Sequence, residues 1–171
     1  MLAISTPWQR PRVLLVLLFC LFANASAFAG LAVSPIFGSN MVLQRGTTVP
    51  VFGTADPGVS VTVQFSGQSV SAIADAAGKW RANLSSMAAS TAPSSLTVTS
   101  GSTTISFTGV QVGEVWLCSG QSNMGFPLSN ADSSAPAIAD AGNHNIRLFR
   151  MTAGNGPASS TWQVAASNNV G

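Results

Sequence analysis

Residues 113–126, "GEVWLCSGQSNMGF", mark a change in the character of the sequence. The apolar run from Val115 to Cys118 is continuous, which is typical of a strand buried on both faces of an α/β sheet. The run ends in a glycine-flanked loop, where Ser122 stands between two amide side chains. The flanking sequence has to decide whether Ser122 is an ordinary loop serine or a nucleophile at the end of a strand.

The sequence upstream of this stretch consists of short segments typical of strands, separated by turn signals. "VSVTVQFSG" (59–67) alternates apolar and polar residues, and "KWRANLSSM" (79–87) does the same. Asp56-Pro57-Gly58 and the sequence 75–78 are typical turns, because proline presets φ and glycine accepts a positive φ. We therefore predict an antiparallel β-sandwich over residues 30–112. The residues expected to face its core are Val59, Val61, Val63, Phe65, Trp80, Ala82 and Leu84.

The sequence downstream of Ser122 indicates a different architecture. "SNADSSAPAIADAG" (129–142) predicts a short helix that is capped by Asp132 or Ser133 and ends at Gly142. "NIRLFRM" (145–151) then predicts a short strand. The order strand, loop, helix, strand is how a parallel α/β domain begins. Residues 113–171 are too few to close such a sheet, so we expect an incomplete domain.

The first 29 residues have the three-part pattern of a secretory signal peptide. A basic flank with Arg10 and Arg12 precedes an apolar run over 13–23, and a tail of small residues follows. Cleavage is expected after Ala27 or Ala29. The apolar run is shorter than the ~18 residues that a membrane span needs. We therefore expect a secreted or periplasmic protein with no membrane anchor after cleavage.

Removing this segment brings the charge close to neutral. The chain has seven basic and five acidic residues, and loss of Arg10 and Arg12 leaves five of each sign. A neutral balance gives no reason to expect a nucleic-acid partner. Cys118 remains as a lone cysteine, expected to be a buried apolar residue. One histidine and scattered acids form no ligand cluster, so no metal or cofactor is predicted.

The position of Ser122 is compatible with catalysis. Sites in open α/β sheets form beyond the carboxyl ends of strands, and Ser122 follows the predicted strand directly. Gly120 allows a sharp turn, in which exposed N–H groups can stabilise an oxyanion. The G-x-S-x-G elbow is absent, however, and most loop serines only bond to nearby backbone groups. On spacing alone, the ordinary loop serine is the favoured interpretation.

A family resemblance changes this balance. "VGEVWLCSGQSNM" (112–124) resembles the signature of the sialate O-acetylesterase family, a group of SGNH-type carbohydrate esterases. The upstream segments "PIFGSNMVLQRG", "VPVFGTADPGVSVTV" and "DAAGKWRANL" resemble its N-terminal β domain, and they occur in the same order. Downstream, "NIRLFRM" and Trp162 correspond to a strand and a tryptophan of the family. The resemblance extends from Leu31 to Trp162.

The resemblance implies a fold, a reaction and a nucleophile. The implied fold is an all-β N-terminal sandwich followed by the truncated start of an α/β/α domain, SGNH hydrolase-like and flavodoxin-like. The implied reaction removes O-acetyl groups from sugars, typically sialic acids, through a Ser-His-Asp arrangement. Ser122 falls on the nucleophile position, with its own N–H as one oxyanion donor. Gly120, Gln121 and Asn123 fall on supporting positions of the loop.

The catalytic acid and base of the family have no counterpart here. Its D-x-x-H block, and the glycine and asparagine that complete the oxyanion site, belong to later blocks. We therefore expect the chain to be an inactive fragment of an esterase that acts on an O-acetylated sugar or glycan. The alternative is a non-catalytic, secreted β-sandwich module that binds glycan or packs against a partner.

The remaining candidate residues have ordinary structural interpretations. His144 is the only histidine, and we interpret it as a partly exposed loop residue rather than the base. Asp132 and Asp140 are interpreted as helix-end and surface acids. Trp80 and Trp116 resemble sugar platforms, but their predicted strand positions favour packing in the core.

Overall fold

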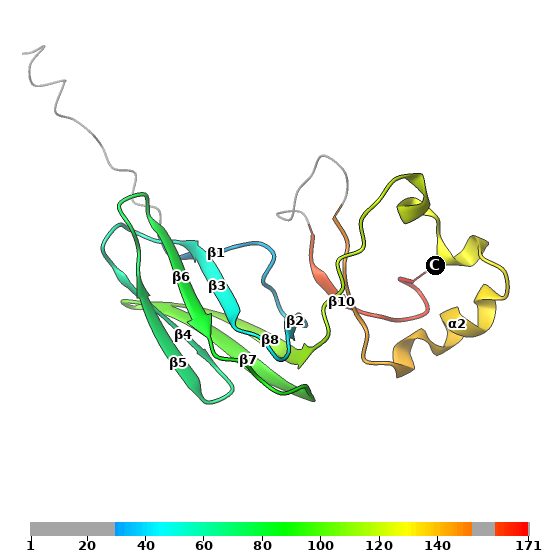
Figure 1. Ribbon diagram of the computed structural model, residues 1–171, viewed down its shortest axis with the longest axis horizontal. Helices are drawn as coiled ribbons and strands as arrows, with labels where there is room; N and C mark the ends of the chain where they lie inside the picture. Colours follow the sequence, from blue (N-terminus) through cyan, green and yellow to red (C-terminus); the bar gives the residue numbers. More distant parts are fainter. Residues whose placement is uncertain (1–29, 152–159, 171) are drawn as a thin grey trace, which may run out of the picture.

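The computed structural model describes residues 30–151 and 160–170. The predicted signal peptide in residues 1–29 lies outside these ranges. The described residues form a β-sandwich, built from strands β1 to β8, and a smaller C-terminal part (Figure 1). Among the described helices, none has the length and apolar character needed to cross a bilayer.

Two sheets make up the sandwich, and most of its strand pairs are antiparallel. The three-stranded sheet has the order β1-β3-β6, and the five-stranded sheet has the order β2-β8-β7-β4-β5. The strands are β1 (Ala32–Val33), β2 (Val42–Gln44), β3 (Val49–Thr54), β4 (Ser60–Phe65), β5 (Gln68–Ile73), β6 (Lys79–Leu84), β7 (Ser90–Ser100) and β8 (Thr103–Gly113).

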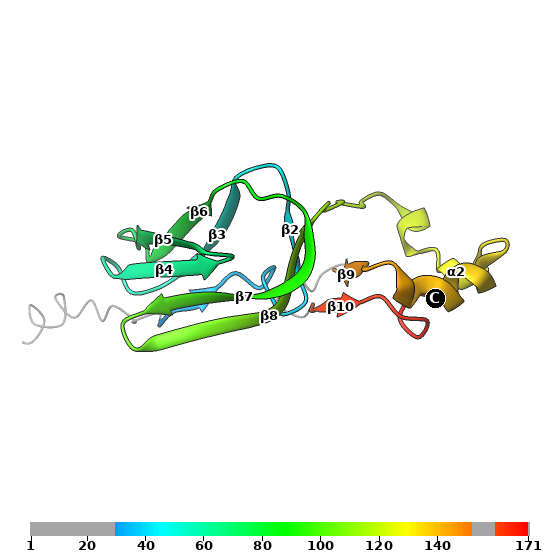
Figure 2. The ribbon, with the colours of Figure 1, turned by 90° about the horizontal axis from the view of Figure 1, so that it is seen from below.

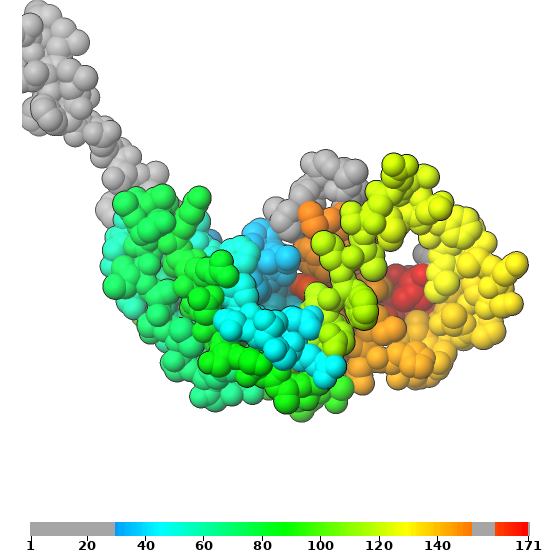
Figure 3. Space-filling view, in the orientation of Figure 1, coloured from blue at the N-terminus to red at the C-terminus, as the bar shows by residue number. Residues whose placement is uncertain are grey.

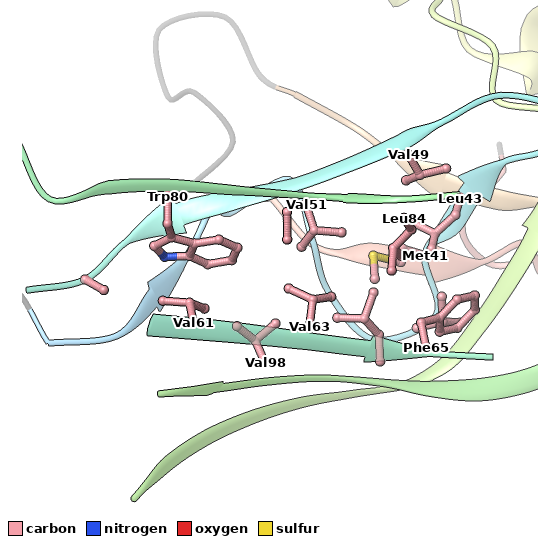
Figure 4. Packing of buried hydrophobic residues seen from close by; sticks show 14 of the residues in the cluster. Met41, Leu43, Val49, Val51, Val61, Val63, Phe65, Trp80, Leu84 and Val98 are labelled. Atoms are coloured by element: carbon pink, nitrogen blue, oxygen red, sulfur yellow. The ribbon is translucent and has the colours of Figure 1, made fainter. Parts of the chain in front are cut away.

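The core lies between the two sheets and follows from the alternating pattern of the strands (Figure 4). Every second residue of β4 and of β6 is buried, which confirms the predicted inward faces of both strands. Trp80 is 2% exposed, so its predicted place in the core is confirmed. The other residues in the core cluster are Met41, Leu43, Val49, Val51, Ala55, Val61, Val63, Phe65, Ala74, Ala82, Leu84, Leu96, Val98, Val110 and Val112.

Both predicted turns are present, and each depends on a glycine with positive φ. In the first turn, Val59 N donates to Asp56 O over 3.2 Å, and Gly58 has φ of 79°. In the second turn, Asp75 Oδ1 accepts hydrogen bonds from the backbone N–H groups of Ala77 and Lys79. An aspartate that bonds the backbone two residues ahead holds such a turn in place. The first turn connects β3 to β4 and the second connects β5 to β6, so each passes the chain from one sheet to the other.

The five-stranded sheet departs from the predicted antiparallel arrangement at one edge. Strand β2 pairs with β8 in parallel, with Val42 opposite Gln111. The register of β7 with β8 shifts in the half of β8 that contains Gly109, whose φ is 70°. A Cβ at Gly109 would lie 2.4 Å from Asn40 Oδ1, so only glycine fits there. Such irregularities bend a strand, and the sheet curls accordingly (Figure 2).

The smaller part consists of short elements. They are the 3-10 turns η1 (Ser122–Gly125), η2 (Leu128–Asn130) and η3 (Ala141–Asn143), helix α2 (Ser134–Asp140) and strands β9 (Arg147–Phe149) and β10 (Trp162–Val164). The predicted helix and the predicted strand around 147–149 are therefore present. Ser133 precedes the helix, as predicted, but its side chain forms no cap hydrogen bond.

The strand arrangement in this part differs from the one predicted. Strands β9 and β10 pair antiparallel, with Trp162 opposite Phe149. The expected start of a parallel sheet is not formed by the described residues. Two neighbouring parallel strands must be joined by a crossover connection. Strand β9 instead pairs with β10, the next strand along the chain.

The packing of the core predicts a large difference between two similar substitutions. Leu84→Ala removes a side chain that is fully buried, so we expect unfolding free energy to fall by about 2–5 kcal/mol. Ile73→Ala removes a side chain that is 72% exposed, and we expect a change within about 0.5 kcal/mol. Urea unfolding followed by tryptophan fluorescence measures both. Equal effects of the two substitutions would contradict the described core.

Candidate functional site

The segment that carries Ser122 is attached to the sandwich by a hydrogen-bonded cluster at the end of β8. The Glu114 carboxylate accepts from Arg45 Nε at 2.6 Å and from Gln44 Nε2 at 2.9 Å. Gln44 Oε1 in turn accepts from the backbone N–H of Val115 at 2.8 Å, and Arg45 N donates to Gly113 O. We call these three side chains, Gln44, Arg45 and Glu114, the exit clamp. It fixes the direction in which the chain leaves the sheet.

The exit clamp also perturbs the titration of Glu114. Hydrogen bonds from Gln44 and then from Arg45 lower the pKa of the Glu114 carboxyl below its usual range. The carboxylate form is favoured because both donors bond to the ionised group. Both side chains of the Arg45–Glu114 ion pair are about half exposed, so the pair contributes little to the free energy of unfolding. Its main effect is to orient the two side chains.

The run after the exit clamp is not the buried strand that its composition predicts. Strand β8 ends at Gly113, and residues 114–121 form no regular element. Trp116 is 83% exposed and Leu117 93% exposed, and Cys118 is exposed as well. The predictions that Trp116 and Cys118 are buried are therefore wrong. A strand buried on both faces needs neighbouring strands and covering helices, and the described residues supply neither around this run.

Ser122 is the first residue of the turn η1, and it is exposed to solvent. Met124 N donates to Gln121 O over 2.9 Å, and Phe126 N donates to Asn123 O over 3.2 Å. These bonds fix the turn but leave the N–H groups at its start without an internal acceptor. Among the described residues, the Ser122 hydroxyl has no hydrogen-bond partner.

The supporting residues surround Ser122 in sequence and are exposed like it. Gly120 does not have a positive φ. A Cβ at Gly120 would instead lie 3.0 Å from Met124 Cγ, so a larger residue there would crowd the Met124 side chain. Gln121 occupies the position before η1, with φ of −109°, and its side chain does not cap the turn. Asn123 lies within η1.

His144 pairs with Asp140 rather than with Ser122. His144 Nε2 lies 2.5 Å from Asp140 Oδ2, and Asn143 Nδ2 donates to Asp140 Oδ1. These bonds, first from Asn143 and then from His144, lower the pKa of Asp140. The His144 side chain is 57% exposed, which confirms its interpretation as a partly exposed loop histidine. Both acids interpreted as surface residues, Asp132 and Asp140, are exposed.

The nucleophile candidate and the histidine lie in different places. Turn η1, yellow-green in Figure 1, and turn η3, orange, are separated in Figure 1 and in Figure 2. No hydrogen bond between described residues joins Ser122 to His144. The structure therefore does not bring the nucleophile candidate and the Asp140–His144 pair together. In the described ranges, no group of three or more His, Cys, Asp or Glu residues could hold a metal ion.

A second attachment joins the C-terminal part to the sandwich. Trp162 Nε1 donates to Ile36 O over 2.7 Å, and the indole packs against the sandwich core. The Phe149 ring stands 5.2 Å from the Trp162 ring and tilts by 41°. The hairpin of β9 and β10 is thereby fixed to the loop after β1. The sequence carries no local signal for this contact or for the exit clamp, because both join residues far apart in the chain.

Comparison with known proteins gives a partial match. No protein-family model matches the chain, and no curated protein matches it. A solved structure of a carbohydrate acetylesterase from Xanthomonas citri is similar, with a TM-score of 0.72 and 30% sequence identity. The match covers 82% of this chain and 34% of that protein. The chain thus spans about a third of the length of the acetylesterase and has a similar fold.

A second solved structure is much less similar. A bacterial ice-binding adhesin of 1.5 MDa is 20% identical, with a TM-score of 0.28 over 46% of this chain and 32% of that chain. A match this weak does not bear on the fold or on the function.

The exit clamp leads to a prediction about pH. Because the folded-state pKa of Glu114 is lowered, its stabilising contribution is present above its unfolded value of about 4.3 and is lost as pH falls through the folded value. Gln44→Ala removes the largest cause, so we expect the pKa of Glu114 to rise. A carboxyl ¹³C NMR titration measures this change. Gln68→Ala removes an amide that bonds to the Ser85 backbone outside the clamp, and it should leave the pKa of Glu114 unchanged. An unchanged pKa in Gln44→Ala would contradict the clamp.

Proposed function

We propose that this chain is the N-terminal part of an exported carbohydrate O-acetylesterase in which Ser122 is the nucleophile. The observation that carries the proposal is the similarity to the carbohydrate acetylesterase over most of this chain. The exposed position of Ser122, at the start of a turn with free N–H groups, supports its role. Export rests on the signal-peptide pattern of residues 1–29.

The chemistry assigns separate tasks to Ser122 and its surroundings. The Ser122 oxygen attacks the acetyl carbonyl carbon, while a general base takes the hydroxyl proton. The sugar oxygen leaves with that proton, and water then hydrolyses the acetyl-serine. The Ser122 N–H is suited to stabilise the developing oxyanion. Gln121 and Asn123 can orient the substrate or support the loop, but neutral amides cannot act as the base.

We further propose that residues 113–171 begin an α/β/α domain of the SGNH type, whose later residues supply the acid and the base. The exposed run 115–118 supports this, because an apolar segment of this kind is normally covered. Figure 3 shows segment 114–130, yellow-green to yellow, looping out beside the sandwich at the surface. The span of about a third of the similar esterase agrees with an incomplete domain.

The substrate is proposed to be an O-acetylated sugar, with acetylated sialic acid as the first candidate. The similar acetylesterase supports a sugar substrate, and the family resemblance of "GEVWLCSGQSNM" supports sialic acid. Hydrolysis of acetylated sialic acid compared with acetylated xylose or glucosamine tests this choice. Faster release of acetate from acetylated xylose or glucosamine would overturn the sialate assignment and leave the esterase assignment intact.

The proposed role of Ser122 predicts the kinetics of the complete polypeptide that carries this chain. Ser122→Ala should lower kcat by about 10⁴-fold or more, because the covalent route is lost. Ser119→Ala removes the other hydroxyl beside Gly120, and its kcat should stay within about tenfold of the wild type. Acetate release from an acetylated sugar measures both. A larger loss in Ser119→Ala than in Ser122→Ala would show that the nucleophile is assigned wrongly.

The same proposal predicts little activity in the 171-residue chain itself. Without a base in contact with it, Ser122 remains a neutral alcohol at neutral pH. Turnover of p-nitrophenyl acetate should not exceed that of the Ser122→Ala control. A clear Ser122-dependent rate would mean that the chain is catalytically sufficient, and it would bring His144 back as the candidate base.

A further inference from the structure

A groove on the three-stranded sheet lies apart from Ser122. It has a volume of about 720 Å³ and runs along β1, β3 and β6, with the segment 32–35 as one wall. These strands lie together in the sandwich of Figure 1, whereas η1 belongs to the C-terminal part. Ligand sites typically have volumes of this order and combine apolar walls with a few polar groups. The groove is therefore large enough for several sugar units.

The groove contains an exposed aromatic ring that is held in a fixed orientation. Phe52 is 41% exposed, and Phe37 packs edge-on against it with ring centroids 5.2 Å apart. An edge-to-face partner restricts the ring and leaves one face open. Gly53, next in β3, allows β1 to approach closely, since a Cβ there would lie 2.1 Å from Ala32 O. The wall beside Phe52 depends on that approach.

The polar part of the groove is mainly basic. Lys79 and Arg81 line it and point outward, and Arg81 lies directly opposite Phe52 in the register of β3 with β6. Neither forms an ion pair with a carboxylate of the described residues, which include all five acids of the chain. Asp75 is the only acid in the groove, and its Oδ1 is used by two backbone N–H groups. Two cations with no carboxylate partner thus flank one exposed ring.

We propose that this groove binds a carboxylated glycan, such as a chain containing uronic acid. The carboxylate accepts hydrogen bonds from Lys79 and Arg81, and the apolar face of a sugar ring packs on Phe52. Guanidinium groups match carboxylates in geometry, and ammonium groups supply mobile donors. The groove would hold the protein on an acidic polysaccharide, independently of any chemistry at Ser122.

Isothermal titration with oligogalacturonate, a neutral xylo-oligosaccharide and a sulfated carrageenan oligosaccharide, which carries no carboxylate, tests the proposal. Oligogalacturonate should bind most tightly, and its Kd should rise as salt screens the charges. Phe52→Ala and the double variant Lys79→Gln/Arg81→Gln should each raise Kd by about tenfold or more. Two matched controls, Ile73→Ala for an exposed apolar residue and Arg150→Gln for an exposed cation, should leave Kd unchanged. Thermal melting of each variant confirms that it is folded.

Three results would overturn the proposal. Equal or tighter binding of the neutral oligosaccharide would remove the role of Lys79 and Arg81. Tighter binding of the sulfated oligosaccharide would remove the assignment to carboxylate. Undetectable binding of oligogalacturonate to the folded wild-type protein would show that the groove is not a binding site for a carboxylated glycan. None of these measurements depends on esterase activity, so the groove and the proposed function fail separately.

Discussion

The hydrogen bonds between Gln44, Arg45 and Glu114 hold the junction on which the candidate site depends. They lie where parallel pairing of β2 with β8 ends, and they bond the first residues that leave the sheet. Arg45 N also bonds to Gly113 O, so backbone and side chains fix the same point. Since Ser122 lies only a few residues beyond, its direction from the sandwich is set there. The indole of Trp162 fixes the far end of the same part to Ile36.

The two parts of the molecule differ in how they are stabilised. The sandwich has a continuous core in which side chains of two sheets interdigitate. The C-terminal part has only Ala141 and Ala165 as buried residues within its described segments, while Trp116, Leu117 and Phe126 are exposed. Burial of apolar area is the main source of stability, so this part depends on its two attachments to the sandwich. A loop positioned by a rigid scaffold is also where binding and catalytic residues commonly lie.

The sandwich could be predicted from the sequence because its signals are local. Alternation in 59–67 and 79–87 placed Val61 and Trp80 in the core, and Asp56 and Asp75 marked the turns. The parallel pairing of β2, the exit clamp and the groove around Phe52 could not be predicted, because they depend on which strands become neighbours. Phe52 and Arg81 are opposite each other only through the register of β3 with β6. The prediction of a buried strand at 115–118 failed for a related reason. An apolar composition shows that a segment needs neighbouring strands and helices to cover it, but it does not show whether the described residues provide that cover.

Trapping the acetyl group tests the central claim most directly. The complete polypeptide is mixed with an O-acetylated sugar, quenched during turnover and digested, and acetylated peptides are located by mass spectrometry. If Ser122 is the nucleophile, the acetyl group is found on Ser122 during turnover, and it disappears after the substrate is exhausted because the intermediate is hydrolysed. Turnover with the acetyl group on another residue, or with no acetylation of Ser122 at any quench time, would contradict this account.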